Sequence, residues 1–316
     1  ELAPHCSSTL YLTYELPEAA YDGAFLEMIM SAEKTADIIE EDFDANVIAW
    51  AQFVLPVQRL PRKQTISGRM FVKEKGKRYL EIGSGENCCR VDLANGMLVS
   101  LQKNKKEQLK RACDLIMWRA LTDNDASCKD TWVKDHLHKT YFRPYGYRIR
   151  KEEEQIILTF HGMLGANSRV PVYAVTITYT FTAEAVCVSI DAVKNNRLRA
   201  INCSDGEKAD EDSNLKTEIL EIPRFGMRFA LNPEMESLEY FGKGKRECYI
   251  DYQQHARMGT FKSTVTQEYE PYIRPQECGN HIKTKWLRLN SETGENLVFR
   301  TEKEFEFSTL HYTVEE

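Results

Sequence analysis

Strict alternation of apolar and polar positions dominates the chain. Residues 173–182 place Tyr, Val, Ile, Tyr and Phe on one face, with Ala and Thr on the other. Because successive side chains of a strand point to opposite faces, this pattern predicts a half-buried strand. After a two-residue break the alternation resumes over 186–190, which predicts a hairpin. The same period recurs over 225–231 and 305–307, so we expect many strands.

Turn and helix signals support an all-β chain. Asn-Gly at residues 95–96 separates the apolar segments 90–94 and 97–101. Both turn residues tolerate a positive φ, as a tight hairpin requires. Helical periodicity is scarce, and only residues 127–139 predict a short helix. Its apolar side would hold Trp132, Val133 and Leu137.

A polar segment at residues 56–68, which includes two prolines, marks a domain boundary. The part before it has too few strands for a complete sandwich, so we expect residues 1–58 to be the end of a β domain. Its strand candidates are residues 11–16, 24–30 and 47–55. A second polar segment, 204–214, predicts an exposed loop.

Composition and charge narrow the class of protein. Of 316 residues, 42% are hydrophobic and 28% are charged, which is enough apolar surface for a core. The 42 basic and 48 acidic side chains give a net charge of −6. Nucleic acid and anionic membranes attract basic surfaces, so this balance argues against both partners. The longest apolar stretch, residues 47–57, is too short to cross a bilayer.

The nine cysteines are an odd number and include no CxxC pair. A chain of this length can bury a core without disulfides, so we expect reduced thiols and a cytoplasmic location.

Two chemical motifs favour ordinary structural roles. GKGKRE at residues 242–247 lacks the Walker spacing and a following helix pattern, so it predicts a strand and turn rather than a nucleotide loop. His136 and His138 could share one face of a strand, but zinc needs at least a third ligand, so two surface histidines are favoured. No GxSxG elbow or activated cysteine is present, and we expect no catalytic nucleophile and no metal site.

The stretch WRALTDND, residues 118–125, ends in Asp123, Asn124 and Asp125. Such side chains bond back to nearby backbone amides, so the motif favours an ordered loop, with Arg119 neutralising the aspartates. A site for chemistry remains the alternative.

The stretch YEPYIRPQECGN, residues 269–280, is held extended by its two prolines. A rigid ribbon results, and it presents Tyr269, Tyr272, Arg274, Gln276 and Glu277. Aromatic rings beside planar amide, carboxylate and guanidinium groups suit sugar hydroxyls. The alternative is that the tyrosines pack and Glu277 pairs with Arg274 or Arg288.

Together these segments resemble the large bacterial β-galactosidases of glycoside hydrolase family two. WRALTDND is similar to their Trp-Arg-Ala-Pro-Thr-Asp-Asn-Asp, with Leu121 in place of the proline, and YEPYIRPQECGN to their Tyr-x-x-Pro-Tyr-x-x-Pro-Gln-Glu-x-Gly-Asn. GKGKRECYID at 242–251 and AWAQFVLP at 49–56 resemble two further family motifs. RVDLANGMLVSL, residues 90–101, resembles an early hairpin of the family.

The resemblance implies an all-β fold. Residues 59–316 would form the large antiparallel β-supersandwich, galactose mutarotase-like, that ends these enzymes, and residues 1–58 part of an immunoglobulin-like β-sandwich. It also implies that the paired catalytic glutamates and the magnesium and sodium ligands lie on a TIM barrel upstream. Family members extend past the last matched strands, so we expect a fragment, truncated at its C-terminus and without cofactor or catalytic residue of its own.

The function expected from the resemblance is that of a non-catalytic part. It would cover the mouth of a site that hydrolyses galactosides such as lactose, and it would join the remaining domains in a homo-oligomer. The 118–125 loop would bear a lid at residues 126–130, anchored by Arg119. One alternative is an aldose epimerase using Glu277 with His161 or His281, and the other is a purely structural oligomerisation module.

Overall fold

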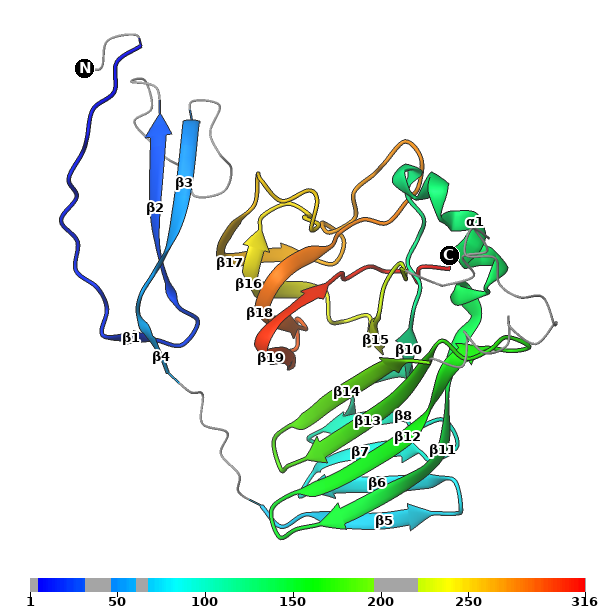
Figure 1. Cartoon of the computed structure of the whole chain (residues 1–316). Helices are drawn as coiled ribbons and strands as arrows, with labels where there is room; N and C mark the ends of the chain where they lie inside the picture. Colours follow the sequence, from blue (N-terminus) through cyan, green and yellow to red (C-terminus); the bar gives the residue numbers. More distant parts are fainter. Residues whose placement is uncertain (1–4, 32–46, 61–67, 196–220, 316) are drawn as a thin grey trace.

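The computed structural model describes residues 5–31, 47–60, 68–195 and 221–315. Strands dominate them, and α1 (Lys129–Lys134) is the one α-helix of this part of the chain (Figure 1). Apart from the two-residue parallel pair of β1 (Ala19–Ala20) with β4 (Gln58–Arg59), the paired strands are antiparallel. The predicted all-β class is confirmed, whereas the predicted loop 204–214 lies outside the described residues.

Two sheets face each other to form the larger sandwich, seen in the lower half of Figure 1. The first sheet has the order β5 (Phe71–Lys75), β6 (Tyr79–Ser84), β7 (Asn87–Asp92), β8 (Met97–Lys103) and β9 (Lys106–Glu107). The second has the order β11 (Thr140–Lys151), β12 (Ile156–Ala166), β13 (Tyr173–Phe181) and β14 (Val186–Lys194). Ile82 and Val91 from one sheet and Leu158 and Ile177 from the other are fully buried in one core. Burial of apolar side chains from both sheets therefore holds the sandwich together.

The alternation read from the sequence matches the burial along β13. Val175, Ile177 and Phe181 are buried, while the threonines between them are half-buried on the outer face. Tyr179 is also buried, and its hydroxyl donates to the carbonyl of Gly96 at 2.9 Å. Gly96, with φ 70°, lies in the predicted turn between β7 and β8. The hairpins at both places are confirmed.

The predicted helix over residues 127–139 is wrong in extent. Helical structure there is divided among the 3-10 helix η1 (Asp123–Ser127), α1 and the 3-10 helix η2 (Leu137–Lys139). His136 has φ 59°, a left-handed conformation that an α-helix cannot continue through. Trp132 and Leu137 are buried as expected, but Val133 is 45% exposed.

Another four-stranded sheet, the β16–β19 sheet, lies outside the larger sandwich. Its order is β17 (Arg257–Thr264), β16 (Ser237–Gly244), β18 (His281–Asn290) and β19 (Asn296–Phe307). Leu238, Tyr240 and Leu289 are central to its core. The pair β10 (Leu109–Ile116) and β15 (Gly226–Leu231) runs between this sheet and the larger sandwich. Phe229 of β15 packs against Phe299 of β19, with ring centroids 5.1 Å apart, so the two parts share contacts.

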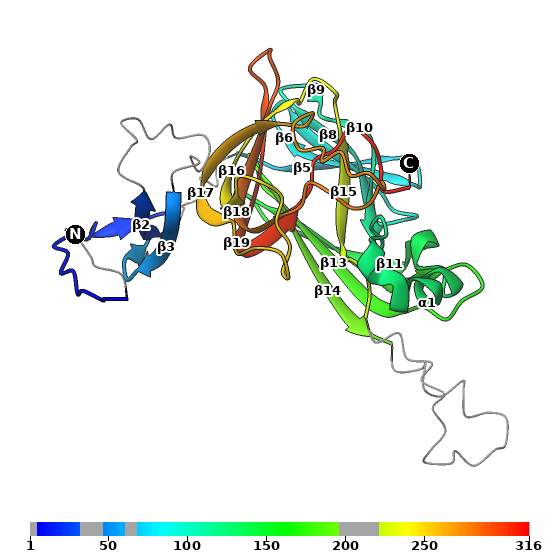
Figure 2. The ribbon, with the colours of Figure 1, turned by 90° about the horizontal axis from the view of Figure 1, so that it is seen from above.

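The N-terminal part contributes a hairpin of β2 (Ala24–Ser31) and β3 (Val47–Leu55), which lies beside β16 and β17 (Figure 2). The Gln52 amide donates to the carbonyl of Met258 at 2.7 Å and accepts from its N–H at 2.9 Å. Glu27 pairs with Arg257 at 2.7 Å. The predicted strands 24–30 and 47–55 are confirmed, but the predicted strand 11–16 is wrong because residues 6–17 form no strand.

Candidate functional site

The 118–125 loop is ordered by an ion pair within itself. Arg119 donates to the two carboxylate oxygens of Asp125 at 2.8 and 2.9 Å, and the N–H of Thr122 donates to the same carboxylate at 2.7 Å. Asp125 is 6% exposed. Burial alone would raise the pKa of Asp125, but these donors outweigh it and hold the pKa below its usual range. The carboxylate is therefore an ionised anchor at the start of η1.

The other two residues of the DND tip face solvent. Asp123 and Asn124 are exposed, and Arg274 contacts Asp123 at 3.1 Å. Because both charged side chains are well exposed, this pair contributes little to stability. It nevertheless places the middle of the 269–280 ribbon against the 118–125 loop.

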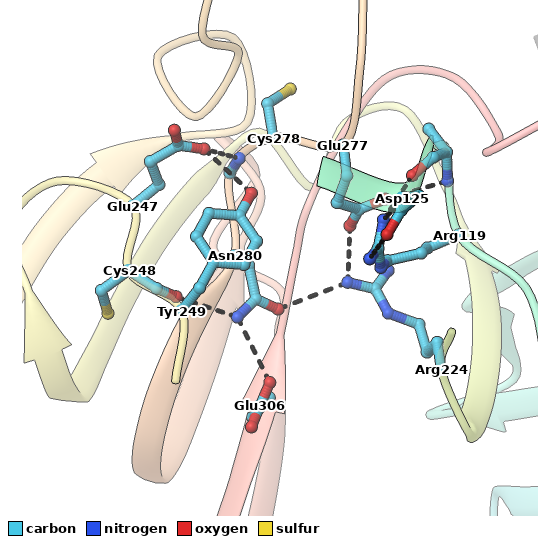
Figure 3. A network of polar contacts seen from close by, with 12 residues as sticks. Arg119, Asp125, Arg224, Glu247, Cys248, Tyr249, Glu277, Cys278, Asn280 and Glu306 are labelled. Carbon is cyan, nitrogen blue, oxygen red and sulfur yellow. Dashed lines mark hydrogen bonds and ion pairs between the residues drawn. The ribbon is translucent and has the colours of Figure 1, made fainter. Parts of the chain in front are cut away.

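Glu277 joins the two motifs from below. Its buried carboxylate accepts the N–H of Ala120 at 3.2 Å and a guanidinium N–H of Arg224 at 2.5 Å (Figure 3). The predicted partners were wrong, since Arg274 pairs with Asp123 and Arg288 with Glu239. Arg224 lies in the chain just before β15 and belongs to none of the sequence motifs.

Asn280 extends the same network into the β16–β19 sheet. Arg224 donates to the Asn280 side-chain oxygen at 3.4 Å, and the amide nitrogen of Asn280 donates to the carbonyl of Cys248 at 3.0 Å. The same nitrogen reaches Glu306 of β19 at 3.3 Å (Figure 3). With the backbone N–H of Cys248 donating to the Asn280 carbonyl at 2.7 Å, the ribbon's end is fixed on both faces.

Glu247 forms a second buried anchor for the ribbon. Its carboxylate accepts the N–H of Gly279 at 2.7 Å and the hydroxyl of Tyr249 at 3.1 Å, and also the hydroxyl of Tyr272. Burial, reinforced by Glu247, raises the pKa of both tyrosines, so their hydroxyls stay protonated donors. The Tyr272 hydroxyl is occupied by Glu247, so only the exposed aromatic ring of Tyr272 is available to a ligand.

The remaining predicted ribbon residues differ in accessibility. Arg274 is exposed and Gln276 is half-buried. Tyr269 is exposed and lies with its ring centroid 6.0 Å from that of Tyr312. The structure therefore brings Arg119, Ala120, Asp125 and Glu277 together in the interior. It leaves the other candidates nearer the surface: Asp123, Asn124, Tyr272, Arg274 and Gln276.

The histidines considered for acid–base chemistry are held elsewhere. His281 is fully buried, bonds to Glu268, and lies 3.0 Å from the hydroxyl of Tyr240 through its other ring nitrogen. Exposed His161 is 3.0 Å from the hydroxyl of Thr176 on β13. Among the described residues neither histidine is a hydrogen-bond partner of Glu277, whose carboxylate bonds with Arg224 and Ala120 instead.

Of the two motifs given structural roles, GKGKRE matches its prediction and the histidine pair does not. GKGKRE begins within β16, where a Cβ at Gly242 would lie 2.6 Å from the Thr284 hydroxyl, so strand packing requires this glycine. His136 and His138 are half-buried rather than on the surface, with ring centroids 6.0 Å apart. Within the described ranges no group of three or more His, Cys, Asp and Glu side chains could hold a metal ion. No helix there is long and apolar enough to span a bilayer.

Comparison with known proteins adds a family. The model described as "Beta galactosidase small chain" matches residues 84–316. A β-galactosidase of Actinobacillus pleuropneumoniae is 25% identical over 319 residues, covering 99% of this chain and 28% of that protein. The β-galactosidase of Priestia megaterium gives the same identity over 322 residues, again with 99% and 28% coverage. The chain thus spans little more than a quarter of the length of these relatives.

Proposed function

Because the chain belongs to the β-galactosidase small-chain family, we propose that it is the non-catalytic C-terminal portion of a β-galactosidase. The resemblance read from the motifs is confirmed at the level of this family. The whole enzyme would hydrolyse terminal β-D-galactosides such as lactose. Its reaction would use two carboxylates on an upstream barrel, together with the magnesium and sodium sites of that barrel.

One observation carries this proposal: the buried carboxylates of the candidate site are all engaged by donors. A retaining glycosidase needs two carboxyl groups about 5 Å apart, one of them a neutral acid with a raised pKa. Asp125 has a lowered pKa instead, beside Arg119. Glu247 and Glu277 are held by three and two donors that come from the protein itself. Such carboxylates position a loop and a ribbon and are poorly placed to attack or protonate a sugar.

The side chains above these anchors are proposed to face the mouth of the active site. Asp123, Asn124 and Arg274 are exposed polar groups, and the Tyr272 ring is partly exposed beside them. This combination suits the hydroxyls and the apolar face of a galactoside or its leaving group. Gln276 would join them if a ligand approaches the ribbon.

The proposed lid at residues 126–130 has a specific structural basis. The end of η1 and the start of α1 occupy this segment, and its side chains are mostly exposed. Trp132 anchors α1 by donating its indole N–H to the carbonyl of Glu221 at 3.1 Å. A short helical turn between the Asp125 and Trp132 anchors could close over a substrate as a unit.

The assembly follows from the same proposal. Residues 1–58, which include the β2–β3 hairpin, would supply the C-terminal portion of an immunoglobulin-like β-sandwich, and residues 59–316 would form the supersandwich. Exposed apolar side chains on the hairpin, Met30, Ile48 and Val54, support further strands packing there. We propose a homo-oligomer located in the cytoplasm, and the eight free cysteines among the described residues support the location.

A two-component assay tests the function. The 316-residue chain is mixed with a chromogenic galactoside, alone and together with the upstream part of the same polypeptide supplied in trans. The chain alone should give no turnover, and the mixture should exceed the upstream part alone. Arg119→Ala should reduce the gain, whereas the matched control Arg148→Ala, on the exposed face of β11, should not.

Three outcomes would contradict the proposal. Turnover by the chain alone that is lost in Glu277→Gln would place catalysis within it. Polarimetric mutarotation of galactose by the chain alone, lost in the same variant, would favour the aldose epimerase. A mixture no more active than the upstream part would remove the role in completing the site.

A further inference from the structure

A polar pocket lies outside the candidate site, where β11 begins and the turn between β12 and β13 folds beside it. Its volume is about 110 Å³. The polar groups that matter lie on both sides of the opening: Tyr141, Arg143, Tyr145, Asn167, Ser168 and Arg169. Nothing in the proposed function uses these residues.

The pocket is positively charged. Its lining includes the guanidinium groups of Arg143 and Arg169 and no Asp or Glu side chain. Within the described ranges neither arginine has a carboxylate partner: Arg143 donates to the Tyr141 hydroxyl, and Arg169 to the carbonyl of Lys134 at 3.0 Å. By contrast Arg119, Arg224 and Arg228 each pair with a carboxylate. Both arginines are exposed, so solvent screens their mutual repulsion, and an anion that enters the pocket gains two guanidinium donors.

The backbone shapes this pocket with two local departures from regular structure. The pairing of β11 with β12 shifts between Pro144 and Gly146, so Tyr145 has no opposite partner in the ladder. A bulge of this kind redirects a side chain, and Tyr145 is 73% exposed at the rim. Ser168, with φ 58°, turns the chain back so that Asn167 and Arg169 both reach the opening.

The phenol of Tyr141 organises the donors. Its hydroxyl lies 2.5 Å from the Asn167 side-chain oxygen, to which it donates while accepting from Arg143. The Arg143 guanidinium carbon also lies 5.5 Å from the centre of the Tyr141 ring. These contacts hold the planar guanidinium group in one orientation, which lowers the entropy lost when it binds a ligand.

We propose that this pocket binds an oxyanion, a phosphate or sulfate group carried by a sugar or free in solution. Guanidinium groups form bidentate, charge-assisted hydrogen bonds with such anions. The pocket is smaller than the several hundred Å³ that enclose a whole ligand, so it fits one anionic group while the rest of a sugar lies over Tyr145. The inference is independent of the proposed function.

Calorimetric titration of the 316-residue chain tests the site, with inorganic phosphate, a hexose 6-phosphate and the unphosphorylated hexose as probes at constant ionic strength. Phosphate and hexose phosphate should bind saturably, and the plain hexose should not. Arg143→Gln and Arg169→Gln should each weaken binding about tenfold or more, the loss of one charge-assisted contact. Arg148→Gln, on the same strand outside the pocket, is the matched control and should leave binding unchanged.

The outcomes separate the sources of the anion. Tighter binding of the hexose phosphate than of inorganic phosphate assigns a sugar-borne group, and equal affinity assigns the free anion. Absence of saturable binding, or equal weakening by the Arg148 variant, overturns the proposal. Circular dichroism melting of each variant identifies any that fails to fold, and Arg143→Lys, which keeps the charge but loses the fork, should then bind with intermediate affinity.

Discussion

Arg224 donates to Glu277 at 2.5 Å, and this pair connects the chain before β15 to the 269–280 ribbon. Glu277 is nearly inaccessible, with 2% of its side chain exposed, whereas Arg224 is 21% exposed. Because Glu277 also accepts the N–H of Ala120, the ion pair indirectly sets the position of the 118–125 loop. The candidate site thus depends on a residue outside both motifs.

Arg224→Ala should destabilise the chain by about 3 kcal/mol, because it leaves the Glu277 carboxylate buried with a single weak donor. Chemical denaturation followed by fluorescence measures the free energy of unfolding. The matched control is Arg274→Ala, which removes an exposed ion pair with Asp123 and should cost less than about 1 kcal/mol. Equal effects of the two variants would show that Glu277 does not depend on Arg224.

Asp125→Asn should loosen the 118–125 loop without unfolding either sheet. The substitution removes the negative charge that binds Arg119 and keeps the shape, so we expect a loss of about 2 kcal/mol. Faster amide hydrogen exchange at Thr122 would report the loss locally, because that N–H donates to the Asp125 carboxylate. Asp123→Asn, at the exposed end of the motif, should leave exchange at Thr122 unchanged.

The sign of the Asp125 effect with pH follows from its lowered pKa. A group whose folded pKa is depressed stabilises the fold above its unfolded pKa of about 3.9, and this contribution is lost as pH falls through the folded value. The wild-type chain should therefore lose loop protection in acid. The Asn variant should show a smaller loss over the same range, which hydrogen exchange at several pH values would measure.

Local patterns predicted the strands because alternation depends only on which face of a sheet is buried. The same reasoning failed for residues 11–16, since a strand also needs a paired neighbour and residues 6–17 pair with no strand of the described chain. The helix over 127–139 failed at His136, whose left-handed backbone no periodicity reveals. The motif resemblance, by contrast, singled out two segments far apart in the sequence that contact each other in the fold, through Arg274 with Asp123 and Glu277 with Ala120.

Partner choice within the site was beyond local reasoning. The alternative interpretation of the ribbon paired Glu277 with Arg274 or Arg288, both of which are near it in the sequence. The actual partner, Arg224, is 53 residues away and belongs to no motif. A buried carboxylate must find a cation, so the sequence predicts that Glu277 has a partner, but only the packing of β15 beside the ribbon determines which one.

Gly242→Ala should destabilise the β16–β19 sheet. A methyl group there would lie 2.6 Å from the Thr284 hydroxyl and 3.0 Å from its Cα, so β16 and β18 would have to separate. We expect a loss of about 2 kcal/mol, the usual effect of overpacking. Gly146→Ala is the control, since nothing lies within 4 Å of a Cβ at that position, and thermal unfolding of the two variants compares them.

The stability of the β16–β19 sheet should fall as pH rises above neutrality, because His281 loses its proton. Burial alone lowers the pKa of this histidine, but hydrogen bonds with Cys248 and Glu268 outweigh burial and raise the pKa to about 9. A raised folded pKa gives stability that is complete below the unfolded value of about 6.5 and is lost as pH passes through the folded value. The loss between these limits should be on the order of 3 kcal/mol.

Unfolding free energies measured from pH 6 to 10 should show this decrease in the wild type and a smaller one in Glu268→Gln, in which the charged partner of His281 is absent. A flat wild-type profile would mean that His281 is neutral in the folded chain throughout this range.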